Sequence, residues 1–275
     1  MNLKIIFLSI FIAFYFINIG FSQPVNFGKI TYTKAINIAG RQRMLSQRVS
    51  KAYISQVAGY QEFSAKKELQ SGIRIFEEQL MLLAKNTKDP RLLDALTNVS
   101  DYWSDYQKLL NTTPNKATAI LLLNKNSYLL ELCDRFVQLI EEQYQDIAHT
   151  KEKDYYLIRT VNYSGKQRML SQRLCLYFLG AKMYSKQRND YKLVLRKTFN
   201  AFDSTITQLM TSPFNDPEVR KCLSQILFYW EPLKTKEREL YLGNLELDSI
   251  FKTTNYLTDS FDTITALYQE QTTSN

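Results

Sequence analysis

Histidine is almost absent from this sequence of 275 residues, and glycine is scarce. The single histidine, His149, lies in a charged segment where we expect a solvated side chain. The sequence also lacks a cluster of residues with metal-ligand spacing, a nucleophile motif and a glycine-rich phosphate loop. We therefore expect no enzyme activity, no metal ion and no cofactor.

Cysteine is also rare, and its pattern argues against a disulfide framework. The three cysteines, Cys133, Cys175 and Cys222, are widely spaced and odd in number. We interpret them as small buried apolar residues, with a Cys175–Cys222 disulfide as the alternative.

Charge is nearly missing from the N-terminus. Lys4 is the only charged residue before Lys29, and the apolar run 5–21 follows it. A basic start, an apolar stretch and small residues near Ser22 predict a signal peptide over residues 1–22, which places the rest in the periplasm or outside the cell. An uncleaved N-terminal anchor is the alternative, because an apolar run of about 17 residues is at the short limit for spanning a bilayer.

The exported part is basic. Removal of Lys4 lowers the formal net charge only from +8 to +7. A basic surface suggests an anionic partner. Export argues against nucleic acid and leaves small anions, cell-surface polymers or lipid headgroups.

Residues that interrupt helices are missing from long stretches. No glycine occurs between Gly72 and Gly165, and Pro90 and Pro114 stand where helices would begin. Apolar residues recur at helical spacing, and no strand alternation is evident. The sequence predicts an all-α fold with helices near residues 33–60, 62–86, 90–111, 116–150, 156–187, 189–212, 217–239 and 246–272.

The sequence does contain an internal repeat. "AGRQRMLSQR" at residues 39–48 returns as "SGKQRMLSQR" at residues 164–173, an offset of 125. Further matches follow in the same order at offsets up to 128: Phe76 with Phe202, Asp89-Pro90 with Asp216-Pro217, Tyr102-Trp103 with Tyr229-Trp230, and Tyr128 with Tyr256. We expect the paired tyrosine and tryptophan residues to anchor the core. The pattern predicts a tandem duplication, residues 29–150 and 151–275, each copy an antiparallel four-helix bundle.

The joint between the copies has two interpretations. From Asn115 to Ser164 neither proline nor glycine interrupts the chain. One interpretation is a long shared helix of about 70 residues, roughly 100 Å, that stacks the two bundles end to end. A break near Thr150 is the alternative.

The arginine before the methionine of each decamer is the candidate binding residue. Arg43 shares its helical face with small residues such as Gly40, and Arg168 is flanked likewise by Gly165. A buried charge needs a partner. In a purely structural role that partner would be a carboxylate on another helix, such as Glu77, Glu78 or Asp101. The alternative is an anion held between two such arginines, and a planar guanidinium suits nitrate, nitrite or a small carboxylate.

A family resemblance rests on the same residues. "INIAGRQRMLSQR" (36–48) and "VNYSGKQRMLSQR" (161–173) resemble the P-box helix of PilJ-type domains. These are the N-terminal sensor modules of type IV pili methyl-accepting chemotaxis transducers, and they are related to periplasmic nitrate/nitrite sensor domains. The resemblance covers nearly all of the mature chain, in two tandem copies.

The resemblance implies a site. In the nitrate-sensing relatives the matching arginine binds the anion at a symmetric interface between helices, and that role carries over to Arg43 and Arg168. The surrounding motif positions are expected to support these two residues; they are Gly40, Ser46, Gln47, Arg48, Gly165, Ser171, Gln172 and Arg173.

Members of the family continue into a second transmembrane helix and a cytoplasmic signalling region, whereas this sequence ends at "QEQTTSN". We therefore expect an exported, sensor-like protein that binds a small oxyanion and signals through a separate membrane protein. The alternative is a helical scaffold of the cell envelope that binds no ligand. The two arginines would meet either within one chain or across a homodimer.

Overall fold

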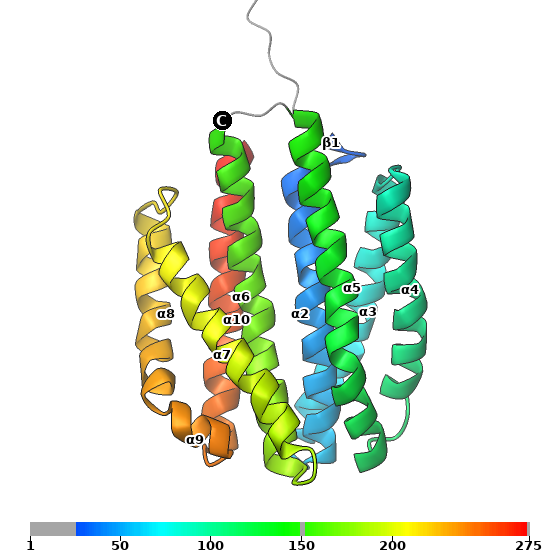
Figure 1. Cartoon of the computed structure of the whole chain (residues 1–275), viewed down its shortest axis with the longest axis vertical. Coiled ribbons are helices and arrows are strands. Elements are labelled where there is room, and N and C mark those ends of the chain that lie inside the picture. The colour runs from blue at the N-terminus through cyan, green and yellow to red at the C-terminus, as the bar shows by residue number, and fades with distance from the viewer. Residues whose placement is uncertain (1–25, 149–151, 274–275) are drawn as a thin grey trace, which may run out of the picture.

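The computed structural model describes residues 26–148 and 152–273, and nearly all of them are helical (Figure 1). A short hairpin, β1 (Asn26–Phe27) and β2 (Ile30–Thr31), precedes the helices. The first half of the chain then forms α2 (Tyr32–Val57), α3 (Glu62–Asn86), α4 (Pro90–Leu110) and α5 (Lys116–Ala148). The second half forms α6 (Glu152–Met183), α7 (Arg188–Met210), α8 (Pro217–Thr235), α9 (Glu237–Leu242) and α10 (Leu247–Thr273).

The expected all-α helical bundle is confirmed, and the local signals for helix starts are visible in the structure. Asp89 caps α4 by accepting a hydrogen bond from the backbone N–H of Arg91 at 2.8 Å. Asp216 caps α8 by accepting from the N–H of Val219 at 2.8 Å. In both helices a proline follows the cap, where its missing N–H costs no helical hydrogen bond.

The expectation of a long shared helix is wrong. α5 ends at Ala148 and α6 begins at Glu152, and the two helices run in opposite directions, α5 upward and α6 downward in Figure 1. The halves therefore lie side by side. α2 and α6 pack against each other in the middle, with α3 and α4 on one side and α7 and α8 on the other (Figure 1). Apolar surface explains this arrangement, because end-to-end stacking would leave the packed faces of α2 and α6 in water.

The halves share one hydrophobic core. The larger buried cluster contains Val49 and Trp103 from the first half together with Leu174 and Trp230 from the second. Each tryptophan packs on a phenylalanine of the neighbouring helix, with ring centroids 3.8 Å apart for Phe76–Trp103 and 4.4 Å apart for Phe202–Trp230. The tryptophans therefore anchor the core as expected.

The tyrosines that precede them lie at the edge of the core or outside it. Tyr229 is 40 % exposed and contacts Tyr256, and the half-buried Tyr102 contacts Tyr128. The expectation of a buried Tyr-Trp pair therefore holds only for its tryptophan.

The β1–β2 hairpin was not expected, because four strand residues are too few for a periodic signal. Asn26 pairs with Thr31 and Phe27 with Ile30, and Gly28 turns the chain with φ of 62°. Phe27 is 2 % exposed and belongs to a second, smaller buried cluster at this end of the first half.

The remaining sequence expectations meet the structure in part. Cys133, Cys175 and Cys222 are free, so the alternative Cys175–Cys222 disulfide is absent. The predicted signal peptide and His149 lie outside the described residues. Within the described part of the chain, no helix has the length and apolar character needed to cross a membrane.

Candidate functional site

Arg43 lies on α2 at the interface with α6 and is 1 % exposed. Its Nη1 donates to Oδ1 of Asp134 on α5 at 2.6 Å. Its Nη2 donates to Oδ1 of Asn162 on α6 at 2.5 Å. The guanidinium is therefore held by a carboxylate of its own half and an amide of the other half.

Arg168 on α6 is held in the same way and has no exposed surface. Its Nη1 donates to Oδ1 of Asp262 on α10 at 2.5 Å, and its Nη2 donates to Oδ1 of Asn37 on α2 at 2.8 Å. Because Arg43 reaches Asn162 while Arg168 reaches Asn37, α2 and α6 run parallel and in register. The two arginines therefore lie close together within one chain. The sequence had left open whether they would meet within one chain or across a homodimer.

Glycines let the two guanidiniums approach each other. A methyl group placed on Gly40 would lie 3.3 Å from Nη2 of Arg43 and 3.7 Å from Nη2 of Arg168. A methyl group placed on Gly165 would lie 3.0 Å from Nη2 of Arg168. Nε of Arg43 is buried there and has no hydrogen-bond partner among the described residues. A buried N–H donor without an acceptor is costly unless a ligand or a water satisfies it.

Three arginines and two aspartates form the ion pairs of this site. Arg41 also contacts Asp262, with Nη2 2.8 and 2.6 Å from the two carboxylate oxygens. Three arginines, Arg41, Arg43 and Arg168, thus surround the two carboxylates of Asp134 and Asp262. Burial, together with repulsion from Arg41 and Arg43, lowers the pKa of Arg168 to about 10. At neutral pH the guanidinium therefore stays charged and paired with Asp262.

The outer contacts of the two asparagines differ between the halves. Nδ2 of Asn37 donates to Oε1 of Gln269 at 2.6 Å, whereas Asn162 is hydrogen-bonded to the carboxyl group of Glu141. Gln269 and Glu141 are 128 positions apart, the offset of the repeat in this region. Burial raises the pKa of Glu141 above its usual value of 4.5. The Arg43 side therefore carries a third carboxyl group that the Arg168 side replaces with an amide.

The expected supporting residues form a second layer or lie elsewhere. Oγ of Ser46 donates to the carbonyl of Arg43 at 2.7 Å, and Ser171 likewise donates to the carbonyl of Gln167 at 2.8 Å, so both bond to their own helix. Gln172 contacts Asn255 and Thr258 of α10.

The other two motif arginines do not join the pair. Arg173 donates to Oε1 of Gln47 and Oδ1 of Asn126, each at 2.9 Å, at a separate level of the interface between the halves. Arg48 points outward to Glu68 at 2.7 Å, and its side chain is 38 % exposed. Only the two glycines among the supporting positions border the arginine pair.

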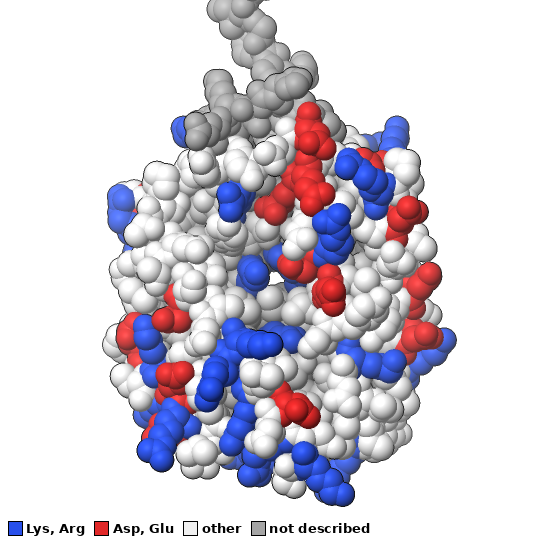
Figure 2. All heavy atoms as spheres, in the orientation of Figure 1, with Lys and Arg blue, Asp and Glu red and all other residues white. Residues whose placement is uncertain are grey.

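The face formed by α5 and α6 is hollowed at mid-height, and basic side chains lie in and below this hollow (Figure 2). Asp134, with a side chain 31 % exposed, lies on α5 and contacts the buried Arg43. Solvent therefore reaches the carboxylate that covers Arg43.

Sequence reasoning missed the groups that hold the arginines. Glu77, Glu78 and Asp101 were considered as partners for Arg43, but Asp134 is the partner. A signal was present in the repeat, since Asn37 recurs as Asn162 at the offset of 125. Asp134 likewise recurs as Asp262 at the offset of 128. Polar residues retained at matching positions are expected to make matching contacts.

The fold and the site together define a helical-bundle protein with two paired, buried arginines on parallel central helices. Residues 32–132 match the family model described as the type IV pili methyl-accepting chemotaxis transducer N-terminal domain, PilJ. The matched part of the chain includes Arg43 and the first decamer, and the match agrees with the PilJ-type resemblance of that motif. No curated protein and no solved structure matches the chain.

Proposed function

We propose that the chain is a sensor-type binding module that holds a small planar oxyanion between Arg43 and Arg168. One observation carries the proposal: two buried guanidiniums converge beside Gly40, and Nε of Arg43 is buried without an acceptor in the described part of the chain. A guanidinium is planar and can donate two parallel N–H groups to the two oxygens of one oxyanion.

The charge at the site favours a monoanion. Arg41, Arg43 and Arg168 carry three positive charges beside the carboxylates of Asp134 and Asp262, and burial disfavours the charged form of the third acid, Glu141. An ion such as nitrate, nitrite or a small carboxylate would offset part of the positive charge of the arginines and reduce the repulsion between the two guanidiniums. The carboxylates of Asp134 and Asp262 would repel a dianion more strongly than a monoanion, which disfavours a dianion.

The sensor role has a structural basis in the interface. The anion would contact α2 and α6 at once, so its binding would favour one spacing of these central helices over another. In this proposal residues 151–275 are a second PilJ-type copy, the chain is exported by residues 1–22, and a separate membrane protein detects the change. The repeated Arg–Asp–Asn contacts of the two halves support the second copy.

A specific observation favours a second candidate function. Each arginine already has an aspartate and an asparagine as partners, which is the arrangement expected of a ligand-free structural cluster. In that case the chain is a helical scaffold of the cell envelope.

Thermal unfolding with added anions separates the two candidates. We expect millimolar sodium nitrate, nitrite or formate to raise the melting temperature, with sodium chloride at equal ionic strength as the control. A ligand at a hundred times its Kd stabilises the folded state by about 2.7 kcal/mol, which is readily measured. No anion-specific rise with any of the three would rule out the oxyanion site and leave the scaffold.

Conservative variants test the residues. Arg43→Lys and Arg168→Lys keep the charge but lose the planar pair of donors, so each should abolish the nitrate shift while far-UV circular dichroism stays unchanged. Arg48→Lys, in the same motif but on the outer surface, should retain the shift. Asp134→Asn removes a competing carboxylate and should strengthen nitrate binding; weaker binding by this variant, if it is folded, would contradict the proposed site.

A further inference from the structure

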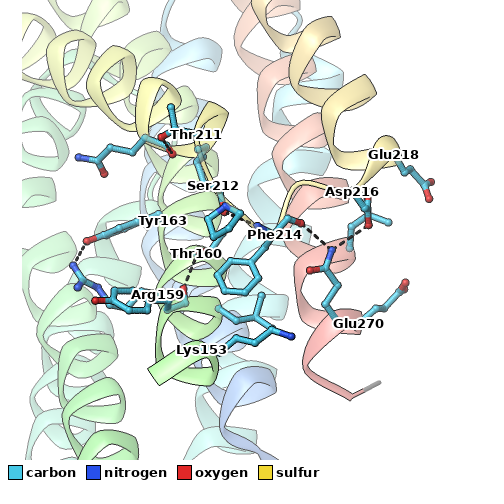
Figure 3. Close-up of a pocket in the computed structure, with 17 residues that line it drawn as sticks. Lys153, Arg159, Thr160, Tyr163, Thr211, Ser212, Phe214, Asp216, Glu218 and Glu270 are labelled. Atoms are coloured by element: carbon cyan, nitrogen blue, oxygen red, sulfur yellow. Dashed lines mark hydrogen bonds between the residues drawn. The ribbon is translucent and has the colours of Figure 1, made fainter. Parts of the chain in front are cut away.

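A pocket of about 1290 Å³ opens at the end of the second half, away from the arginine pair. It lies between the start of α6, the loop that joins α7 to α8, and the end of α10 (Figure 3). Its apolar part includes Leu157, Leu209, Phe214 and Leu267. A pocket of this kind exceeds the roughly 300–1,000 Å³ of most small-molecule sites.

The corresponding place in the first half is filled by the hairpin. Leu157, Leu209 and Leu267 match Tyr32, Leu83 and Leu139 at the repeat offsets of 125, 126 and 128. All three matching residues belong to the same buried cluster as Phe27. The ring of Phe27 packs edge-on against Tyr32, with centroids 5.5 Å apart. In the first half, therefore, the ring of Phe27 fills the place that corresponds to the open pocket of the second half.

The polar frame around both places is also the same. Nε2 of Gln143 donates to Oδ2 of Asp89 at 3.1 Å in the first half. Nε2 of Gln271 donates to Oδ2 of Asp216 at 3.1 Å in the second half. The two ends thus share their framework and differ in whether a peptide segment is docked.

The rim of the pocket carries charges of both signs. Arg159 lies on one side of the pocket, and Glu218 and Glu270 lie on the other, with Phe214 between them (Figure 3). Arg159 is positioned by Tyr155 and Tyr163, whose ring centroids lie 5.5 and 5.4 Å from its guanidinium carbon. A ligand with charge of only one sign would be repelled by one of the two sides.

We propose that this pocket binds a short peptide that has free termini and an aromatic side chain. The ring packs against Phe214 and Leu267, as Phe27 packs in the first half. The terminal carboxylate faces Arg159 and the terminal ammonium faces Glu218. The residues that line this pocket do not include Arg43 or Arg168, so this proposal does not rest on the oxyanion site.

Calorimetry with three matched tripeptides tests the proposal on the full chain. Gly-Phe-Gly with free termini should bind saturably with a stoichiometry of one. Gly-Ala-Gly should give no measurable binding, because it lacks the ring. The acetylated and amidated form of Gly-Phe-Gly should bind at least tenfold more weakly, because it lacks both terminal charges. The absence of saturable binding by Gly-Phe-Gly, or equal binding by the capped form, overturns the proposal.

Variants locate the binding. Leu267→Trp places a larger side chain in the pocket and should abolish Gly-Phe-Gly binding, and Arg159→Gln should weaken it at least fivefold. Arg91→Gln, an exposed arginine at the same end of the first half, should leave it unchanged. Equal binding by wild-type protein and Leu267→Trp, with circular dichroism showing that the variant is folded, would place the peptide elsewhere and contradict the proposal.

Discussion

At the scale of single residues, the arginines of the repeated decamer differ in burial and in their ion-pair partners, although they lie within a few positions of each other. Arg43 is buried, because α6 and α5 cover its helical face and supply Asn162 and Asp134. Arg48 lies on the outside of α2 and pairs with Glu68. An exposed ion pair contributes little to stability, whereas removing one partner of a buried pair costs about 3–5 kcal/mol. Position on the helix, and not residue type, decides the role.

Glu141 provides a pH-dependent prediction. Burial raises its pKa in the folded protein above the usual 4.5. Below that value the carboxyl group is protonated in the folded and unfolded states alike, so it does not affect stability. As the pH rises above it, the unfolded state ionises first, and the folded state is progressively disfavoured. We therefore expect Glu141→Gln to be more stable than wild type at pH 7 and similar to it near pH 4.

Urea unfolding at the two pH values measures this difference. The neighbouring Glu142, whose side chain is 48 % exposed, provides the control, and Glu142→Gln should show no such gain at pH 7. Lower stability of Glu141→Gln at pH 7 would show that its charge is needed by Arg43 and Arg159.

At the scale of elements, the β1–β2 hairpin covers the apolar end of the first half, where Phe27 joins the smaller buried cluster. Asn86 receives it: Oδ1 accepts from the N–H of Lys29 at 2.7 Å. A side chain at Gly28 would come within 2.4 Å of the carbonyl oxygen of Asn86, so only glycine fits this turn. The hairpin therefore depends on a close approach to the end of α3, which no local pattern in the sequence shows.

Truncation of Phe27 tests how much the docked hairpin contributes to stability. Phe27→Ala should lower the free energy of unfolding by about 3–5 kcal/mol, as expected for deletion of a buried phenylalanine ring. Phe63, which is 74 % exposed, supplies the matched control, and Phe63→Ala should change stability by no more than about 0.5 kcal/mol. Both values follow from urea unfolding. Equal effects of the two substitutions would mean that the hairpin is not docked in solution.

Helix boundaries also show where local signals succeed and where they fail. Asp89 and Asp216 mark the starts of α4 and α8 correctly, because capping is a local interaction. The sequence predicted one helix over residues 217–239, but α8 ends at Thr235 and α9 follows as a separate turn. Pro232 lies inside α8 and lacks the N–H that a helix interior uses, so it weakens the helix near this break.

At the scale of the whole molecule, the chain pairs α2 with α6 inside itself. In a one-copy protein, the apolar and arginine-bearing face of α2 would need a second molecule. An isolated first half, residues 24–148, should therefore associate into a homodimer in which the second α2 replaces α6. The intact chain should be a monomer under the same conditions. Sedimentation velocity of both proteins measures this, and a stable, folded monomer of the isolated half would refute it.

The sequence by itself determined the all-α class, most helix boundaries and the two arginines that meet, because helical periodicity, caps and repeats are local patterns. Only the tertiary structure decided that α5 and α6 fold back on each other and that α2 and α6 pair in parallel. It also decided that Asp134, Asp262, Asn37 and Asn162 hold the arginines. These contacts join residues 91 to 131 positions apart. They depend on how the apolar faces of whole helices are buried, which spacing within any one helix does not specify.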